Sequence, residues 1–300
     1  MNVALTGSTG FVGKNLISYL HNYNIKTINL RNENKIIFNS DIEAVIHLAG
    51  KAHDLKNTND ISSYYKINYE LTQKVFDSFI ESNAKIFIFM SSVKAAADSV
   101  NEILTEEYIA NPITHYGKSK LLAEKYIQSI EISKEKYIYI LRPCMIHGPE
   151  NKGNLNLLFK LVSKGIPWPL GRYENKKSFC SIHNLCFIIA KILEKKTIEP
   201  GIYNIADDEC ISTNELIELI SISQKKSKRI INIPKKLIYY IAKIGDVLKL
   251  PLNTERLNKL TENYIVKNDK IKKALEIKNL PMSSKEGLVY TLNSFQNKLK

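Results

Sequence analysis

A tyrosine and a lysine stand four residues apart in this sequence, at Tyr116 and Lys120. On a helix, this spacing places both side chains on one face. An ammonium group near a phenol favours the phenolate, so the spacing predicts a lowered Tyr116 pKa and proton exchange with a substrate hydroxyl or carbonyl. Ser92 could donate a hydrogen bond to the same substrate oxygen. These are the groups that hydride transfer at a carbinol carbon requires when a cofactor carries the hydride.

The elements around these residues would bring them together at one edge of a sheet. Residues 85–90 form a continuous apolar run, which predicts a strand of a parallel sheet covered on both faces. Ser91 and Ser92 follow this strand, and residues 113–133 form the predicted helix that carries Tyr116. Ligands of open α/β sheets bind at the carboxyl ends of the strands. The pattern therefore predicts a catalytic site at that edge.

The first thirteen residues predict a dinucleotide site. Residues 2–6 read as a buried strand, and glycines at positions 7, 10 and 13 make a tight turn into a helix with Val12, Leu16 and Leu20 on one face. Such a turn lets the backbone and the helix dipole approach a pyrophosphate. The residues expected to contact the cofactor here are Gly7, Thr9, Gly10, Phe11, Val12 and Gly13.

The end of the second predicted strand, 26–30, bears on the choice between NAD and NADP. This fold usually has an acidic residue there to hold the ribose hydroxyls, whereas this chain has Arg31, which suits a 2′-phosphate. NADP is therefore preferred, and Glu33 nearby keeps NAD open. Only residues 31–43 separate this strand from the next, at 44–48, so a crossover helix must be lost or reduced. Residues 35–38 are a candidate remnant strand.

The alternation of strands and helices stops beyond residue 149. Helices are expected at 61–83 before this point, and at 154–164, 184–195, 213–224 and 284–299 after it, with a strand at 201–205. We expect a doubly wound α/β domain over 1–150, with 179–206 returning to it. A smaller substrate domain would comprise 151–178 and 207–300. The basic amphipathic segment 234–250 is expected to be a helix of that domain, and peripheral membrane contact is the alternative.

Composition and charge narrow the class of protein. The net charge is +13, but the lysines are dispersed and no nucleic-acid-binding motif is present. Four cysteines without C-x-x-C spacing suggest reduced thiols in a cytoplasmic protein, and no metal site is expected. No apolar run approaches the ~20 residues that span a bilayer, and the chain opens directly with a strand, so no signal peptide is expected.

Taken together, the motifs resemble those of the extended short-chain dehydrogenases/reductases of the NAD-dependent epimerase/dehydratase family. The matching segments are 7–13, His47-Leu48-Ala49-Gly50, Asn68, Ser91-Ser92, 116–120, and 142–149. The resemblance implies a Rossmann-like fold and a catalytic triad of Ser92, Tyr116 and Lys120. It also implies cofactor contacts at Leu48, Ala49, Gly50, Asn68, Tyr116, Lys120 and Pro143. Many relatives form homodimers through the helices that correspond to 61–83 and 113–133.

Segments 152–155, 165–171 and 175–178 are similar to those of the bacterial nucleotide-sugar branch, whose substrates are UDP-sugars. This similarity implies that Asn154 and Lys177 face the UDP diphosphate, with Arg172 and Arg256 as further candidates beside Ser92. The first expectation is reduction of a 4-keto group on a UDP-linked deoxy-amino sugar in surface-polysaccharide synthesis. The alternative is a UDP-hexose or UDP-N-acetylhexosamine 4-epimerase with tightly bound NAD, or its variant with a lipid-linked sugar. A non-catalytic NADP-binding protein on the same fold is a third reading.

Overall fold

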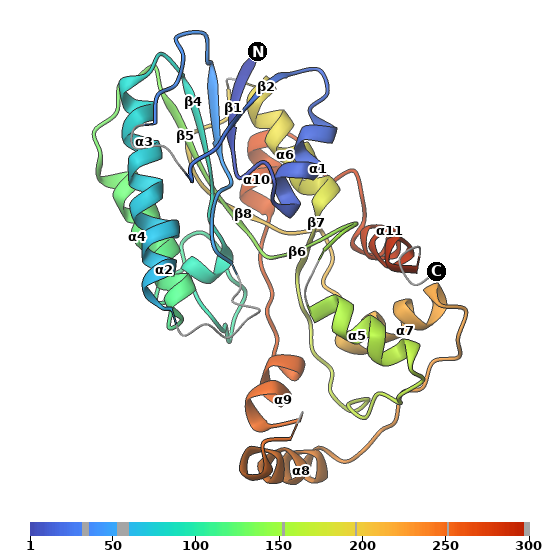
Figure 1. The fold of residues 1–300 in the computed structure, drawn as a ribbon. Coiled ribbons are helices and arrows are strands. Elements are labelled where there is room, and N and C mark those ends of the chain that lie inside the picture. Colours follow the sequence, from blue (N-terminus) through green and yellow to red (C-terminus); the bar gives the residue numbers. More distant parts are fainter. Residues whose placement is uncertain (32–35, 53–59, 152–153, 196, 251, 297–300) are drawn as a thin grey trace.

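A computed structural model describes residues 1–31, 36–52, 60–151, 154–195, 197–250 and 252–296. Its centre is a six-stranded parallel sheet in the order β2-β1-β3-β4-β5-β8 (Figure 1). The strands are β1 (Asn2–Thr6), β2 (Asn24–Ile28), β3 (Ala44–His47), β4 (Ile86–Met90), β5 (Tyr137–Pro143) and β8 (Gly201–Ile205). The order reverses at β1, so the carboxyl ends of β1 and β3 flank the point where such sheets bind ligands.

Helices cover both faces of this sheet, which explains why its inner strands are continuously apolar. One face packs on α1 (Phe11–Tyr19), α6 (Ile182–Glu194) and α10 (Asp269–Leu275), and the other on α3 (Leu71–Glu81) and α4 (His115–Ser129) (Figure 1). Short α2 (Ser62–Tyr65) leads into α3 through a π-helical turn, Lys66–Glu70. The doubly wound α/β architecture predicted from sequence is confirmed.

A second lobe lies beyond the carboxyl edge of the sheet. It contains α5 (Asn154–Ser163), α7 (Thr213–Ser223), α8 (Lys235–Leu248) and α9 (Thr254–Thr261), with α11 (Ser284–Gln296) packed on α7 (Figure 1). A separate hydrophobic cluster, which includes Phe159, Trp168 and Leu292, fills its interior. A two-stranded parallel sheet of β6 (Met145–His147) and β7 (Phe179–Ser181) stands between the lobes.

Several local predictions need correction. The second strand ends at Ile28 rather than at residue 30, so Arg31 lies in the loop beyond it. Residues 36–38 form no strand; Ile36 and Phe38 instead bury their side chains against the sheet. Residues 29–31 and 36–43 contain no helix, which agrees with the predicted loss of a crossover helix.

Candidate active site

The glycine turn brings the start of α1 against the end of β3. Gly7 has φ +71°, and a Cβ there would lie 2.6 Å from the backbone nitrogen of Ala49. A Cβ on Gly13 would lie 2.4 Å from the Gly7 carbonyl oxygen. These contacts admit only glycine. The N-cap of α1 is Gly10, and no side chain caps it, so the first N–H groups of the helix can receive an anion.

A buried histidine ties three elements together behind this turn. His47 Nδ1 lies 2.7 Å from Thr6 Oγ1, and His47 Nε2 lies 3.0 Å from Thr72 Oγ1. Burial, and to a lesser degree the nearby Lys120 ammonium, lower the pKa of His47 to about 3. The ring is therefore neutral at physiological pH and serves to align β1, β3 and α3.

Asn68 holds the loop that follows β3. Its Oδ1 accepts from the Lys51 backbone N–H at 2.8 Å, while its Nδ2 donates to the Lys51 carbonyl and to Ser119 Oγ, both at 3.0 Å. The fully buried Asn68 sits in the π-helical turn, a distortion frequent at functional sites. It therefore joins the loop over residues 48–51 to α4.

Gly50, Asn68 and Lys120 meet at one point. A Cβ on Gly50 would lie 3.1 Å from both Asn68 Oδ1 and Lys120 Nζ. Lys120 is 4% exposed and donates to the Met90 carbonyl at 2.7 Å. Burial lowers its pKa to about 8, against an opposing effect of the Glu124 carboxylate. An ammonium with three donors in this position suits the ribose hydroxyls of a dinucleotide.

Tyr116 lies at the start of α4, within reach of Ser92. Asp98 accepts from the backbone N–H groups of Ile113 and Thr114, and Thr114 caps the helix by accepting from Gly117 N. This arrangement fixes the first turn of α4. A side-chain hydrogen bond with Ser92 acts to lower the pKa of Tyr116, but burial dominates and raises it.

The sequence prediction for the Tyr116 pKa is therefore wrong in direction. Lys120 directs its ammonium group to the Met90 carbonyl and lies 4.8 Å from the centre of the Phe89 ring. The neighbouring Tyr64, at 6.3 Å between ring centroids, adds to the rise. The phenol is thus protonated at neutral pH, and Ser92 is the group that hydrogen-bonds it.

A buried ion pair supports the two strand ends behind the triad. Arg142 Nε and Nη2 donate to Glu124 Oε1 and Oε2 at 2.9 and 2.5 Å. Ser91 Oγ also donates to Glu124 Oε1, at 2.5 Å. These groups are at most 3% exposed and join β4, α4 and β5. Glu124 lies one turn after Lys120, and Pro143 is the buried last residue of β5.

A cluster of lysines, Lys94, Lys177 and Lys259, lies where the segment after Ser92 meets the second lobe. Lys177 is half-buried and donates to the Lys259 carbonyl on α9. Lys94, two residues after Ser92, lies over the Tyr264 ring at 4.2 Å. Burial is the main cause that lowers the pKa of both lysines. Lys259 lowers the Lys94 pKa further, against Asp98 and Glu262, and Lys94 lowers the Lys177 pKa further, against Glu262. Tyr264 donates to the Ala97 carbonyl at 2.6 Å and so fastens the lobes together.

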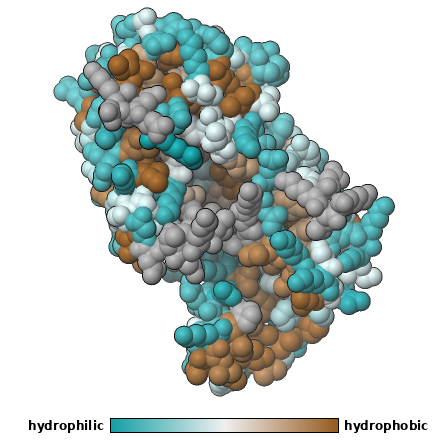
Figure 2. All heavy atoms as spheres, in the orientation of Figure 1, coloured by the Kyte–Doolittle hydropathy of each residue, from teal (hydrophilic) through white to brown (hydrophobic). Residues whose placement is uncertain are grey.

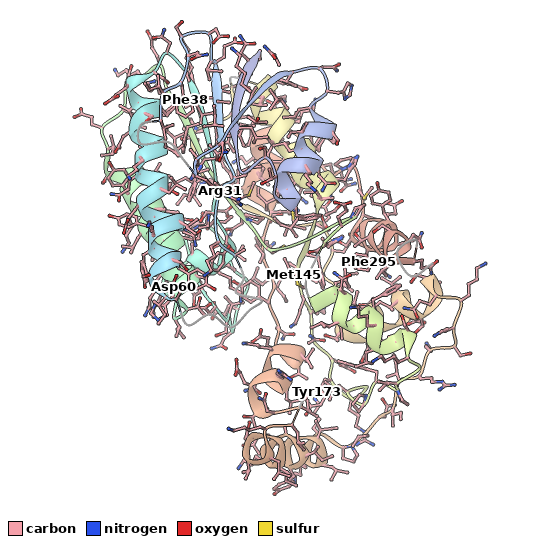
Figure 3. The ribbon with its side chains drawn as sticks, viewed as in Figure 1. Arg31, Phe38, Asp60, Met145, Tyr173 and Phe295 are labelled. Atoms are coloured by element: carbon pink, nitrogen blue, oxygen red, sulfur yellow. The ribbon has the colours of Figure 1, made fainter. Side chains whose placement is uncertain are left out.

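The structure does not bring the remaining predicted cofactor and substrate residues together in one place. Arg172 is exposed beside Tyr173, and Arg256 is exposed on α9, one turn before Lys259. Asn154 begins α5, and its side chain lies outside the described part. Arg31 is exposed near the carboxyl edge of the sheet (Figure 3), while Glu33 lies outside the described residues.

Two contributors were missed from sequence, Lys94 and Glu124, and Arg142 was noted only as part of a matching segment, without a role. Lys94 follows Ser92 closely in the sequence, but no local pattern places its side chain against Tyr264, 170 residues later. Glu124 follows Lys120 at helical spacing, and a carboxylate on the apolar side of α4 was the available signal. Arg142 lies at the end of an apolar strand, and a buried guanidinium there requires a carboxylate partner.

The structure bears on a metal site and on a membrane span only for the residues that it describes. No group of three or more His, Cys, Asp or Glu side chains is arranged to hold a metal in the part of the chain that the structure describes. Within the same residues, no helix is both long enough and apolar enough to cross a bilayer. All four cysteines are free thiols.

The glycine turn, the buried ammonium and the Ser92–Tyr116 pair define an enzyme that exchanges hydride with a nicotinamide dinucleotide and a proton with its substrate. The sequence profile of the NAD dependent epimerase/dehydratase family matches residues 3–206, and the chain belongs to this family. The resemblance inferred from the motifs is thereby confirmed, as is dependence on NAD chemistry.

Three similar proteins are named as sugar-modifying enzymes. A UDP-glucose 4-epimerase of Vibrio cholerae is 32% identical over 251 residues, which cover 75% of this chain and 76% of that protein. An Escherichia coli O157:H7 epimerase of N-acetyl-α-D-glucosaminyl-diphospho-ditrans,octacis-undecaprenol is 27% identical over 91% of this chain and 85% of its own length. A dTDP-4-dehydro-6-deoxyglucose reductase of Escherichia coli is 23% identical over 75% of this chain and 82% of its length.

The fold is shared with a UDP-glucuronic acid 4-epimerase of Bacillus cereus, solved in complex with NAD. Its TM-score is 0.75 at 19% identity, with both chains covered completely. The chain is thus an enzyme of a family of NAD-dependent nucleotide-sugar epimerases, dehydratases and reductases.

Proposed function

We propose that the chain catalyses oxidoreduction at C4 of a UDP-linked sugar, as a 4-epimerase that retains its NAD. The observation that carries the proposal is the hydrogen bond between Ser92 and Tyr116, together with the buried Lys120 ammonium at Gly50, beside the glycine turn that would hold a dinucleotide. The names of two relatives, 32% and 27% identical over 75% and 91% of this chain, support epimerisation.

The residues present fit the dinucleotide. The uncapped start of α1 would receive the pyrophosphate, and Lys120 with Asn68 and Gly50 would border the nicotinamide ribose. When bound, the cofactor supplies a hydride acceptor and donor. Tyr116 would have to act as the phenolate to take the proton of the C4 hydroxyl during oxidation, and it would return that proton on reduction, while Ser92 would hold the same oxygen. The positive charge of bound oxidised nicotinamide would act to lower the Tyr116 pKa that burial raises.

The second lobe would bind the UDP moiety. Lys177 and Lys94 are neighbouring half-buried ammonium groups at the junction of the lobes, and Arg256 lies on α9, whose Lys259 carbonyl accepts from Lys177. Lysine is a point charge for phosphate, without the bidentate geometry of arginine. We assign substrate binding to segments 151–178 and 207–300, with Asn154 and Arg172 as further contacts, in a cytoplasmic protein that forms a homodimer through α3 and α4.

Reduction of a 4-keto sugar is the second candidate. The raised pKa of Tyr116 keeps its phenol protonated, which is the form that donates to a carbonyl oxygen. Arg31, near the carboxyl edge of the sheet, suits the 2′-phosphate of NADPH. A reductase consumes its cofactor, whereas an epimerase does not.

The test is to identify the nucleotide that copurifies with the protein, and then to supply UDP-glucose and UDP-N-acetylglucosamine without added cofactor. Retained NAD and a C4-inverted product support the epimerase. An empty protein that oxidises NADPH only with a 4-keto sugar supports the reductase instead.

Two tyrosine variants on one helix provide the matched control. Tyr116→Phe should reduce turnover at least 100-fold, since general acid–base catalysis contributes about 10²–10⁴-fold. Tyr126 lies farther along α4 and donates a hydrogen bond to Asp77 on α3. Tyr126→Phe loses only that bond and should retain full turnover. Full turnover by Tyr116→Phe would remove Tyr116 from the chemistry, and absence of turnover by the wild-type protein in both assays would favour the non-catalytic reading.

A further inference from the structure

Helix α8 has two apolar faces, and only one of them is used within the molecule. Ile238, Ala242 and Gly245 form a buried stripe at helical spacing. A Cβ on Gly245 would lie 1.8 Å from the Leu252 carbonyl oxygen, so the helix presses directly on the chain that leads into α9. This stripe accounts for the packing of α8 on the second lobe.

The other stripe is open to solvent. Val247 is 80% exposed, Leu248 63%, Tyr240 62%, Ile244 55% and Leu237 51%, and Leu250 continues the surface past the helix end at 43%. Their spacing of three and four residues places them on one face. Figure 2 shows a continuous hydrophobic area at the tip of the molecule where α8 lies in Figure 1. Patches of this kind mark interaction sites.

Lysines border the open stripe. At about 100° per residue, Lys236 and Lys243 fall on the flank of the stripe opposite to the buried residues. Lys235 and Lys249 stand at the two helix ends, and the only acid within α8, Asp246, accepts a hydrogen bond from Thr254 N. Tyr239 lies under Lys243, at 5.0 Å from Nζ to the ring centroid. Aromatic and basic residues beside an apolar stripe are typical of helices that lie in a membrane interface.

We propose that the open face of α8, formed by Leu237, Tyr240, Ile241, Ile244, Val247 and Leu248, docks on an anionic lipid bilayer. The apolar side chains would enter the boundary between headgroups and acyl chains, while the lysines would remain at the anionic headgroups. Because no described helix can span a bilayer, the helix lies on the surface.

Charge favours a bilayer over a second copy of the chain. Pairing α8 with itself would place lysines of the two copies near one another, whereas an anionic surface attracts all of them. The predicted dimer helices α3 and α4 also lie at the other end of the molecule (Figure 1). Docking would leave that surface accessible.

Docking would also bring the second lobe close to the lipid headgroups. Helix α8 packs on α9, whose Lys259 carbonyl receives the Lys177 ammonium. The lysine cluster beside α9 is therefore one helix away from the bilayer.

The experiment is flotation of the full chain with vesicles of phosphatidylcholine, with and without about 30% phosphatidylglycerol. Wild-type protein should float with the anionic vesicles and much less with the neutral ones. Val247→Glu combined with Leu248→Glu should abolish flotation. Ile222→Glu, at an exposed position of α7, is the matched control and should leave flotation unchanged.

The charge arm uses Lys236→Ala combined with Lys243→Ala. The partition onto anionic vesicles should fall roughly 25-fold, at about fivefold for each lysine. The proposal is overturned if wild-type protein does not float with anionic vesicles, or if the double glutamate variant still does. It is also overturned if sedimentation velocity shows a dimer that only the glutamate variant separates, in the absence of vesicle binding.

Discussion

Replacing Glu124 by glutamine should destabilise the protein strongly, because it leaves a buried guanidinium without its counter-charge. Arg142 is 3% exposed, and Glu124, its partner at 2.9 and 2.5 Å, is fully buried. Glutamine keeps the size of the side chain, so the change is almost purely electrostatic. Breaking one side of such a pair costs about 3–5 kcal/mol.

This cost can be converted into a melting temperature. With an unfolding entropy of about 2 cal/mol/K per residue, a 300-residue chain changes by about 0.6 kcal/mol for each degree. The expected loss for Glu124→Gln is therefore about 5–8 °C. Scanning calorimetry measures it, and urea titration with an unchanged slope would confirm that stability alone has altered.

A double-mutant cycle separates the unpaired charge from general repacking. Glu124→Met combined with Arg142→Met replaces both charges with apolar side chains of similar length, so it should cost much less than the sum of the single changes. If Glu124→Gln unfolds within 1 °C of wild type, about 0.6 kcal/mol, the guanidinium has other compensation and the reasoning fails.

Three further predictions concern the turn, the buried histidine and the lysine cluster. Gly7→Ala should lose more than about 1 kcal/mol of stability and most of the NAD affinity, measured by denaturation and titration calorimetry. Gly165→Ala, at φ +70° with only Arg229 Nη1 at 3.6 Å from the added Cβ, should lose less. Since the His47 pKa is about 3 when folded against 6.5 in the free side chain, the unfolded chain binds the proton more readily. The free energy of unfolding should therefore fall by about 1.4 kcal/mol for each pH unit below 6.5. His47→Gln should lack this pH dependence, and an equal slope in both proteins would contradict the prediction. Lys94→Met should raise KM for a UDP-sugar about tenfold with little change in kcat, whereas exposed Lys118→Met should change neither.

The elements with strong periodicity were predictable. The glycine turn, the inner strands and α4 were located because parallel strands covered on both faces read as apolar runs and the helix repeats every three to four residues. Strands β6 and β7 have three residues each, too few for a pattern, and α9 has eight. The π-helical turn around Asn68 leaves no trace in the sequence.

The chemistry of the site was predictable as a set of residues but not as an electrostatic arrangement. Tyr116, Lys120 and Ser92 could be selected from spacing and strand ends. The direction of the Tyr116 pKa could not, because it depends on Lys120 reaching the Met90 carbonyl from another element. Lys94 meets Tyr264 only through the assembled fold.

The sequence placed reduction before epimerisation, whereas we propose the reverse order; the relatives include both 4-epimerases and a reductase. Both reactions use the same side chains, so residue types alone do not separate them. The distinction depends on whether the cofactor leaves after one half of the cycle.

The position of β8 limits how this chain can be divided. Residues 201–205 complete the sheet beside β5. The chain reaches this strand only after residues 151–178, which belong to the second lobe. A fragment that stops at residue 150 would leave β5 as a bare edge, a ready template for aggregation. Recombination between relatives therefore cannot exchange the second lobe as one contiguous cassette. New substrate preferences in this architecture are more accessible through point changes and loop insertions than through domain shuffling.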